Sequence, residues 1–295
     1  MNFNTDIVCV IGEVLVDFVS KEAEVPLKDC KEFKRQVGGS CANVARFLAS
    51  LGRTARLASA VGKDGLGDFL LDKLEEAGVD CSMVARMDFE STSSVVVNKT
   101  SATPQYIPYI AAHRSLDSER MDQSFLEDAS IIHTNGFSIS FEPLRSTVRT
   151  ILHEAHEKGI AISFDPNWRR RLWPDREAAQ DLIKELASIS TWMKPSLDDA
   201  QELFGELPPR ALAEKYLAWG CKTIVLTMGS KGSLVVDKNS CVEVAPKGRL
   251  SCATGAGDAF WSLFLNNTLA GKESVEAAQR ASAEIVEHLE GETQS

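Results

Sequence analysis

The sequence predicts a three-layer α/β/α fold with a mostly parallel central sheet and a small β lid. Short apolar runs typical of buried strands alternate with amphipathic segments that end at a glycine. Two segments, at about 13–37 and 88–115, interrupt this alternation. No linker rich in proline, glycine and serine divides the 295 residues, so we expect one domain over 1–295.

The alternation of strands and helices can be followed along the chain. Strands are predicted at residues 7–11, 55–61, 131–133, 160–164, 191–194 and 223–227. Helices are predicted at 42–48, at 68–77, in the segments that end at Gly159 and Gly220, and after the glycine turn at 255–257. Such alternation produces right-handed crossovers, which place helices on both faces of a parallel sheet.

The two interrupting segments are interpreted together as the β lid. The second contains 95–97, an all-valine run, and Tyr106-Ile107, both beside polar turns. The alternative, two irregular surface excursions, stays open at this point. An exposed lid face carrying the valine run leads us to expect a homodimer through the lid.

Composition excludes several classes of function. A formal net charge of −10 and a pI near 5.1 disfavour a nucleic-acid partner. The dense basic run is 169–171, which fits an anionic substrate or a solvated turn. Seven scattered cysteines without CxxC spacing indicate neither disulfides nor a zinc site. With no signal peptide or bilayer-spanning stretch in the sequence, we expect a cytoplasmic protein without a membrane partner.

A run of small residues before an apolar segment is the strongest local signal for an anion-binding site. In 254–260, small residues allow close backbone approach to a ligand, and a helix start there would direct free N–H groups at an anion. Phosphoryl transfer needs such donors and a carboxylate that accepts the proton of the attacking hydroxyl, for which Asp258 is the candidate. The alternative is that Asp258 is only a helix N-cap. A Walker-type GxxxxGK[ST] motif does not occur.

Gly255–Asp258 together with Gly38–Asn43 resembles the paired signatures of the PfkB, or ribokinase-like, carbohydrate kinases. The resemblance extends over roughly residues 7–265 and implies the ribokinase-like version of the predicted fold. Further motifs follow in the family's order: Gly12-Glu13 with Asp17, 62–64 with Gly67, 165–169 with 172–174, 194–196, and 227–232.

The resemblance implies roles for individual residues. The catalytic residues would be Asp258 as general base, with Gly255, Ala256 and Gly257 as the anion hole. The substrate-binding residues would be Asp17, Gly38, Gly39, Asn43 and Arg169. The nucleotide-binding residues would be Lys194, Thr227, Gly229 and Gly232, with Asp199 near magnesium-bound phosphates where the family usually has Glu. The plain alternatives are a turn residue for Asp17, a helix cap for Asn43, and a hairpin turn for Gly229 and Gly232.

The function implied is an ATP-dependent sugar kinase that uses ATP and Mg²⁺, with fructose as the expected acceptor. A 2-keto-3-deoxygluconate kinase, another sugar or nucleoside kinase, and a catalytically weak sugar-binding regulator remain alternatives. The last is motivated by Cys252 and Ala253, which replace the family's usual Asp and Thr, and by an altered tail around Ser282. Because a thiol is a poor ligand for potassium, we expect little potassium activation.

Overall fold

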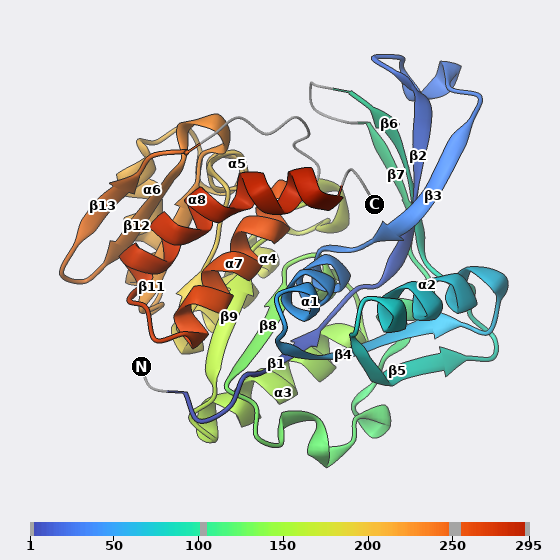
Figure 1. Ribbon diagram of the computed structural model, residues 1–295, viewed down its shortest axis with the longest axis horizontal. Helices are drawn as coiled ribbons and strands as arrows, with labels where there is room; N and C mark the ends of the chain where they lie inside the picture. The colour runs from blue at the N-terminus through green and yellow to red at the C-terminus, as the bar shows by residue number, and fades with distance from the viewer. Residues whose placement is uncertain (1–2, 101–104, 248–254, 293–295) are drawn as a thin grey trace.

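The computed structural model describes residues 3–100, 105–247 and 255–292. The expectations for Cys252 and Ala253 lie outside these described residues. Within them the chain forms a large central sheet, helices on both of its faces, and a second, smaller sheet (Figure 1).

The central sheet has nine strands in the order β13-β12-β11-β10-β9-β8-β1-β4-β5. The strands from β11 to β5 in this order run parallel, while β12 and β13 extend one edge antiparallel. The bounds are β1 (Ile7–Ile11), β4 (Thr54–Gly62), β5 (Asp80–Met87), β8 (Ile131–Asn135), β9 (Ala161–Asp165), β10 (Trp192–Met193), β11 (Thr223–Thr227), β12 (Ser233–Asp237) and β13 (Cys241–Val244).

Two groups of helices cover the two faces of this sheet. One group is α1 (Ser40–Ser50), α2 (Gly65–Glu76), α7 (Ala256–Leu269) and α8 (Ser274–Glu292). The other is α3 (Leu144–Glu157), α4 (Arg176–Ile189), α5 (Leu197–Phe204) and α6 (Pro209–Ala218). Each group closes its own apolar cluster against the sheet, with Leu48 and Phe264 in one and Ile151 and Ile183 in the other. The predicted three-layer α/β/α fold is therefore confirmed.

The smaller sheet has the order β3-β2-β6-β7 and stands beside α1 and α2 (Figure 1). Its strands are β2 (Leu15–Ala23), β3 (Phe33–Gly38), β6 (Ser94–Lys99) and β7 (Tyr106–Tyr109). Pairing is antiparallel except between β2 and β6, which run parallel. The two interrupting segments thus form one sheet and not two irregular excursions. The 3₁₀ turn at Ala112–Ser115 packs against β4, so the end of the second segment belongs to the main body.

Two helices begin earlier than their apolar periodicity indicates, because of local capping. Asp64 Oδ1 accepts hydrogen bonds from the N–H groups of Leu66 (3.0 Å) and Gly67 (2.8 Å), so α2 begins at Gly65. α1 begins after Gly39, whose φ of +96° favours glycine and where a Cβ would lie 2.6 Å from the Glu13 carbonyl oxygen. That contact places the start of α1 against the exit of β1.

Among the described residues, no helix combines the length and apolarity needed to cross a bilayer.

Candidate active site

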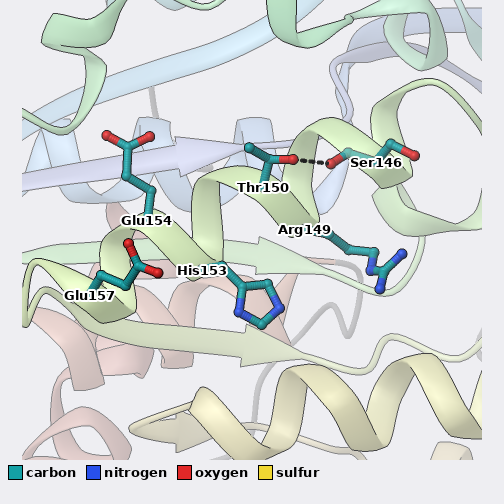
Figure 2. A pocket seen from close by; sticks show the side chains of 6 residues that line it. All are labelled: Ser146, Arg149, Thr150, His153, Glu154 and Glu157. Atoms are coloured by element: carbon teal, nitrogen blue, oxygen red, sulfur yellow. Dashed lines mark hydrogen bonds between the residues drawn. The ribbon is translucent and has the colours of Figure 1, made fainter.

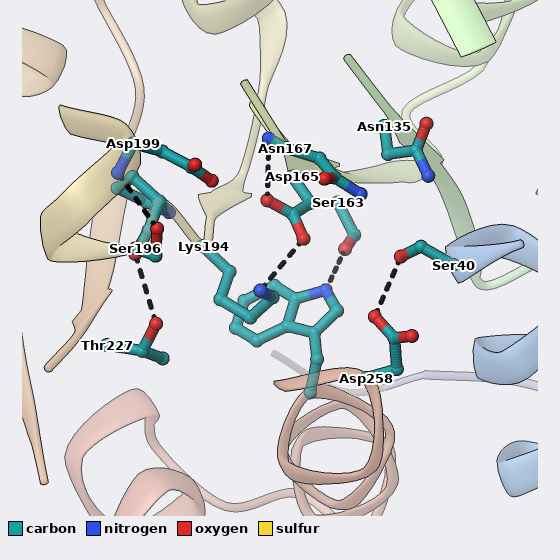
Figure 3. A network of polar contacts seen from close by, with 12 residues as sticks. Ser40, Asn135, Ser163, Asp165, Asn167, Lys194, Ser196, Asp199, Thr227 and Asp258 are labelled. Carbon is teal, nitrogen blue, oxygen red and sulfur yellow. Dashed lines mark hydrogen bonds and ion pairs between the residues drawn. The ribbon is translucent and has the colours of Figure 1, made fainter. Parts of the chain in front are cut away.

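The polar residues of the site come from segments that meet at the carboxyl ends of the parallel strands. Asp165 is the last residue of β9, Lys194 directly follows β10, and Asp258 lies in the first turn of α7. Figure 3 shows the Asp165 and Lys194 side chains between Asp258 on one side and Asp199 on the other. Open α/β sheets bind ligands at this edge, so the fold brings the predicted residues to the expected place.

Asp258 is held by two side chains of α1. Its Oδ1 accepts a hydrogen bond from Ser40 Oγ at 2.7 Å, and its Oδ2 accepts one from Asn43 Nδ2 at 2.9 Å. The N-cap position of α7 is Gly255, which has φ +77° and no side-chain cap. The N-cap alternative for Asp258 is therefore wrong, and so is the cap alternative for Asn43, which lies inside α1.

The environment of Asp258 makes it a weaker acid than a free carboxyl. Burial raises the pKa of Asp258 to about 6, although the charge of Lys194 and the donors Asn43 and Ser40 act in the opposite direction. A carboxylate with this pKa is ionised at neutral pH and accepts a proton more readily than an ordinary aspartate. These are the properties required of a general base.

Glu13 organises the start of α1, a role that the sequence analysis does not assign. The side chain is 2% exposed, and its Oε1 accepts hydrogen bonds from the Ser40 N–H (2.7 Å) and from Asn135 Nδ2 (2.9 Å). Ser138 Oγ donates to its Oε2 at 2.5 Å. Neutral donors thus satisfy this buried carboxylate. The motif Gly12-Glu13 after a predicted strand was the available signal, but nothing in its spacing indicates these partners.

Asp17 lies within β2, so the turn alternative for this residue is wrong. Its carboxyl group is adjacent to Gly38, where a Cβ would come within 2.4 Å of the carboxyl carbon. Burial, together with the charges of Glu13 and Asp258, raises the pKa of Asp17 to about 7. Gly38 is required here because any side chain would occupy the space of this carboxyl group.

Lys194 and Asp165 form a buried ion pair with Nζ and Oδ2 2.8 Å apart. Their side chains are 7% and 5% exposed. Burial opposes the charged form of Lys194, but the Asp165 carboxylate beside it raises its pKa above the ordinary value. A Cβ placed on Gly257 would lie 3.7 Å from Lys194 Nζ, so the ammonium borders the predicted anion hole. Asp165 opens a motif quoted above, but its role was not predicted.

Arg169 and Asp199 lie at the far side of this pair. Arg169 Nη1 is 3.5 Å from Asp199 Oδ1, and Ser196 caps α5 by accepting a hydrogen bond from the Asp199 N–H at 3.1 Å. Burial raises the pKa of Asp199 to about 6 against the opposing charge of Arg169. The long separation makes this a loose pair, so both groups remain available to a ligand.

The connection between β11 and β12 begins after Thr227, the last residue of β11, and contains Gly229 and Gly232. The Thr227 N–H donates to the Pro195 carbonyl oxygen at 3.0 Å, which ties this connection to the segment before α5. Gly229 and Gly232 have φ of +56° and +88°, and a Cβ on Gly232 would lie 2.1 Å from the Val244 carbonyl oxygen. The hairpin-turn interpretation of these glycines is therefore correct as geometry, and their contact with a nucleotide stays a prediction.

A hollow elsewhere on the molecule contains none of the predicted site residues. Figure 2 shows that its lining side chains all belong to α3, including Arg149 and His153. Both of these contact Glu185 of α4, at 2.8 Å and 3.1 Å.

Comparison with known proteins identifies the family. The profile of the pfkB family carbohydrate kinases matches residues 5–287. The chain belongs to this family. The pfkB carbohydrate kinases transfer phosphoryl groups to sugars, so the expectation of a sugar phosphotransferase is confirmed.

Three similar proteins illustrate the range within the family. The chain is 33% identical to an ATP-dependent 6-phosphofructokinase of Thermoanaerobacterium thermosaccharolyticum, over 96% of this chain and 91% of that protein. It is 29% identical to a 2-dehydro-3-deoxygluconokinase of Bacillus subtilis, over 92% and 86%. The structure of Halothermothrix orenii fructokinase superimposes with a TM-score of 0.82, at 32% identity over 95% of this chain and 97% of that one.

Proposed function

We propose that this pfkB kinase transfers the γ-phosphoryl group of ATP to a sugar hydroxyl, with Asp258 as general base. The observation that carries the proposal is the fixed place of Asp258. Ser40 and Asn43 hold its carboxylate at the first turn of α7, where the N–H groups of Gly255, Ala256 and Gly257 have no helical partner. The proposed base and the proposed anion site would therefore lie side by side.

The acceptor sugar would bind between the smaller sheet and the start of α1. Asp17 and Asn43 offer hydrogen-bonding groups to sugar hydroxyls. The backbone of Gly38 and Gly39 would line this site, and the absence of side chains there lets it pack against Asp17 and the Glu13 carbonyl oxygen. Closure of the smaller sheet over the sugar would exclude water, which would otherwise compete as the acceptor. Arg169 would contact the far end of the sugar.

The nucleotide would lie along the β11–β12 connection. The open space beside Gly229 would permit close approach of the adenosine phosphates next to Thr227, while Gly232 supports the turn. Lys194 would face the transferred group. Thr227 ends β11 and Lys194 follows β10, and these two strands are neighbours in the sheet. The proposed nucleotide site would therefore extend from the β11–β12 connection toward Lys194, which borders the anion hole.

Magnesium would be held chiefly by nucleotide phosphates and water, with Asp199 as the carboxylate from this chain. Within the described ranges, no group of three or more His, Cys, Asp or Glu side chains could hold a metal alone, which fits an ion bound largely through phosphates. Asp165 is already occupied by Lys194. When bound, the ion would neutralise charge on the nucleotide phosphates.

In the proposed reaction, Asp258 accepts the proton of the sugar hydroxyl as the hydroxyl oxygen attacks the γ-phosphorus in line. The bond between the γ-phosphorus and the β,γ-bridging oxygen breaks, and ADP leaves. Ser40 and Asn43 keep the carboxylate oriented throughout. The N–H groups at the start of α7 then stabilise the charge on the transferred group.

We propose fructose as the first acceptor to test, supported by the 32% identity to a fructokinase structure. Fructose 6-phosphate and 2-keto-3-deoxygluconate come next, because similar proteins carry those names. ADP formation is measured with each sugar, a nucleoside, and a no-acceptor control, for the wild type and Asp258→Asn. Wild-type turnover with one acceptor and its loss in D258N supports the proposal. Absence of turnover with every acceptor, with sugar binding retained, would favour the weak regulator.

We also propose a cytoplasmic homodimer that associates through the smaller sheet. Strand β7 is an edge of that sheet, and its Ile107 and Tyr109 side chains are 45% and 58% exposed. An exposed apolar edge strand favours pairing with another chain. Sedimentation of the wild type against Ile107→Lys tests this, and a monomeric wild type would contradict it.

A further inference from the structure

The centre of the site contains a buried ion pair, Lys194 with Asp165, that has no part in the proton transfer to Asp258. Lys194 is faced by three carboxylates, those of Asp165, Asp258 and Asp199. Of these three, Asp165 is the one at ion-pair distance, 2.8 Å from Nζ. The others come from α7 and α5, so one ammonium lies among acids from three different elements.

Asp165 is itself rigidly placed. It ends β9, and its Oδ1 accepts a hydrogen bond from the Asn167 N–H at 3.0 Å, while Oδ2 holds Lys194. Lys194 follows β10, the neighbouring strand, and its own N–H donates to the Phe164 carbonyl oxygen at 3.1 Å. Because both residues extend from paired strands, the position of Nζ depends on Asp165 and not on a mobile loop.

We propose that Asp165 is a positioning residue that holds the Lys194 ammonium beside the anion hole and away from the base Asp258. The inference rests on the proposed kinase function and adds a role that the base and the anion hole do not include. Lys194 would contact the transferred phosphoryl group, since Nζ borders the backbone at Gly257. Without Asp165, the Asp258 carboxylate is the acid toward which the ammonium would turn, and the base would be occupied.

The buried pair of Lys194 and Asp165 is difficult to explain by stability alone. An ion pair removed from water gains little stability over an apolar pair, so its retention at this edge indicates a task other than folding. Lys194 keeps donors beyond the one used by Asp165, because an ammonium has three N–H groups. An incoming phosphate can accept from these without breaking the pair.

A double-mutant cycle tests the proposal. Four proteins are compared: wild type, Asp165→Asn, Lys194→Met, and the double variant. We expect D165N to lower kcat at least about tenfold with less than about a threefold change in the sugar KM, because the base is blocked while the sugar site is intact. In the K194M background the same substitution should leave kcat unchanged or raise it, since no ammonium remains to be misplaced.

Asp80→Asn is the matched control. Asp80, the first residue of β5, pairs with Arg56 at 3.6 Å. This pair lies at the amino ends of the parallel strands, whereas the site lies at their carboxyl ends. The substitution should alter the melting temperature without altering kcat. If D165N or K194M fails to fold, the double variant remains informative because it leaves no buried charge without a partner, and its kcat should then lie well below that of wild type.

The outcomes separate the two proposals. A wild type without turnover on every sugar removes the kinase proposal and the role of Asp165 with it. Wild-type turnover with multiplicative effects of D165N and K194M, or with a D165N defect confined to KM, overturns the role of Asp165 alone. Reversal of the D165N effect in the K194M background supports it.

Discussion

The two ends of the candidate site hold their acids in different ways. At the acceptor end, neutral donors surround the carboxylates: Ser40 and Asn43 bind Asp258, while Asn135 and Ser138 bind Glu13. At the donor end, a cation holds the acid, since Lys194 Nζ lies 2.8 Å from Asp165 Oδ2.

The difference follows from what each end would bind. A carboxylate held by neutral donors keeps its charge and its capacity to accept hydrogen bonds from sugar hydroxyls. A phosphate needs cations, and cations paired with acids can be buried before the phosphate arrives.

Removing the base should have the largest effect. We expect Asp258→Asn to lower kcat by about 10³-fold or more, because the hydroxyl loses its proton acceptor. The sugar Kd, measured by calorimetry, should change less than about fivefold, since Asn keeps an acceptor for Ser40. Near-normal turnover in D258N would remove Asp258 as the base.

Asp17 should affect sugar affinity more than chemistry. Asp17→Asn replaces charged hydrogen bonds to the sugar by neutral ones, which costs about 1–2 kcal/mol and raises the sugar Kd about tenfold. The matched control is Gln36→Ala, which removes the side chain of the residue paired with Asp17 across β2 and β3. Equal losses in both variants would contradict a specific role for Asp17.

Activity should fall as the pH falls through the pKa values of these acids. Protonation removes the base Asp258, with a pKa of about 6, and the charged acceptor Asp17, with a pKa of about 7. Below about pH 6, log kcat/KM should decline with a slope approaching two in the wild type and one in D17N. A wild-type profile that is flat between about pH 5 and 8 would exclude both groups.

The contribution of Asp17 to folding stability should fall as the pH rises, whereas activity should rise. The folded-state pKa of Asp17 is raised from 3.8 to about 7, so the folded protein binds more protons than the unfolded chain between these values. Stability from this group is therefore complete below about pH 4 and is lost as the pH rises through about 7. We expect D17N to be more stable than wild type by roughly 4 kcal/mol at about pH 8. Urea unfolding at about pH 4 and pH 8 measures the difference, and a D17N advantage confined to the acidic condition would contradict it.

The smallest effect expected is that of potassium. Cys252 supplies a thiol where the family usually has a carboxylate, so replacing sodium by potassium should change kcat less than about twofold. Rates at equal ionic strength in the two salts decide this. A severalfold increase with potassium would show that other groups supply the missing charge.

Much of the fold was predictable, because periodicity in the sequence reports burial. The strands at Ile7–Ile11 and Thr223–Thr227 have their predicted bounds, since both are continuous apolar runs in a parallel sheet. The prediction omits β5 and β13, the two edge strands, whose residues are mostly partly or fully exposed. It also omits β12, a largely buried strand that lies between β13 and β11. The helices α4 and α5 are omitted too, although the apolar residues of both recur at helical spacing, with Leu182 and Leu186 buried in α4 and Leu203 buried in α5.

The site was predictable where a motif included the functional residue and not where the role depends on a distant partner. Motif order indicated Asp258 and Asn43, yet their direct hydrogen bond joins residues 215 positions apart. Glu13 and Asp165 appeared in quoted motifs without roles, because their partners Ser40 and Lys194 come from other elements.

By itself, the sequence determined the alternation of strands and helices, the glycines that open α1 and α7, and the acid that follows the second of them. Those features are local, because they depend on side-chain period and on backbone conformations that favour glycine. Which acids are held by neutral donors and which by a cation depends on contacts between elements that are far apart in the sequence. That division depends on which strand ends become neighbours, and burial there sets the charge and the pKa of each group.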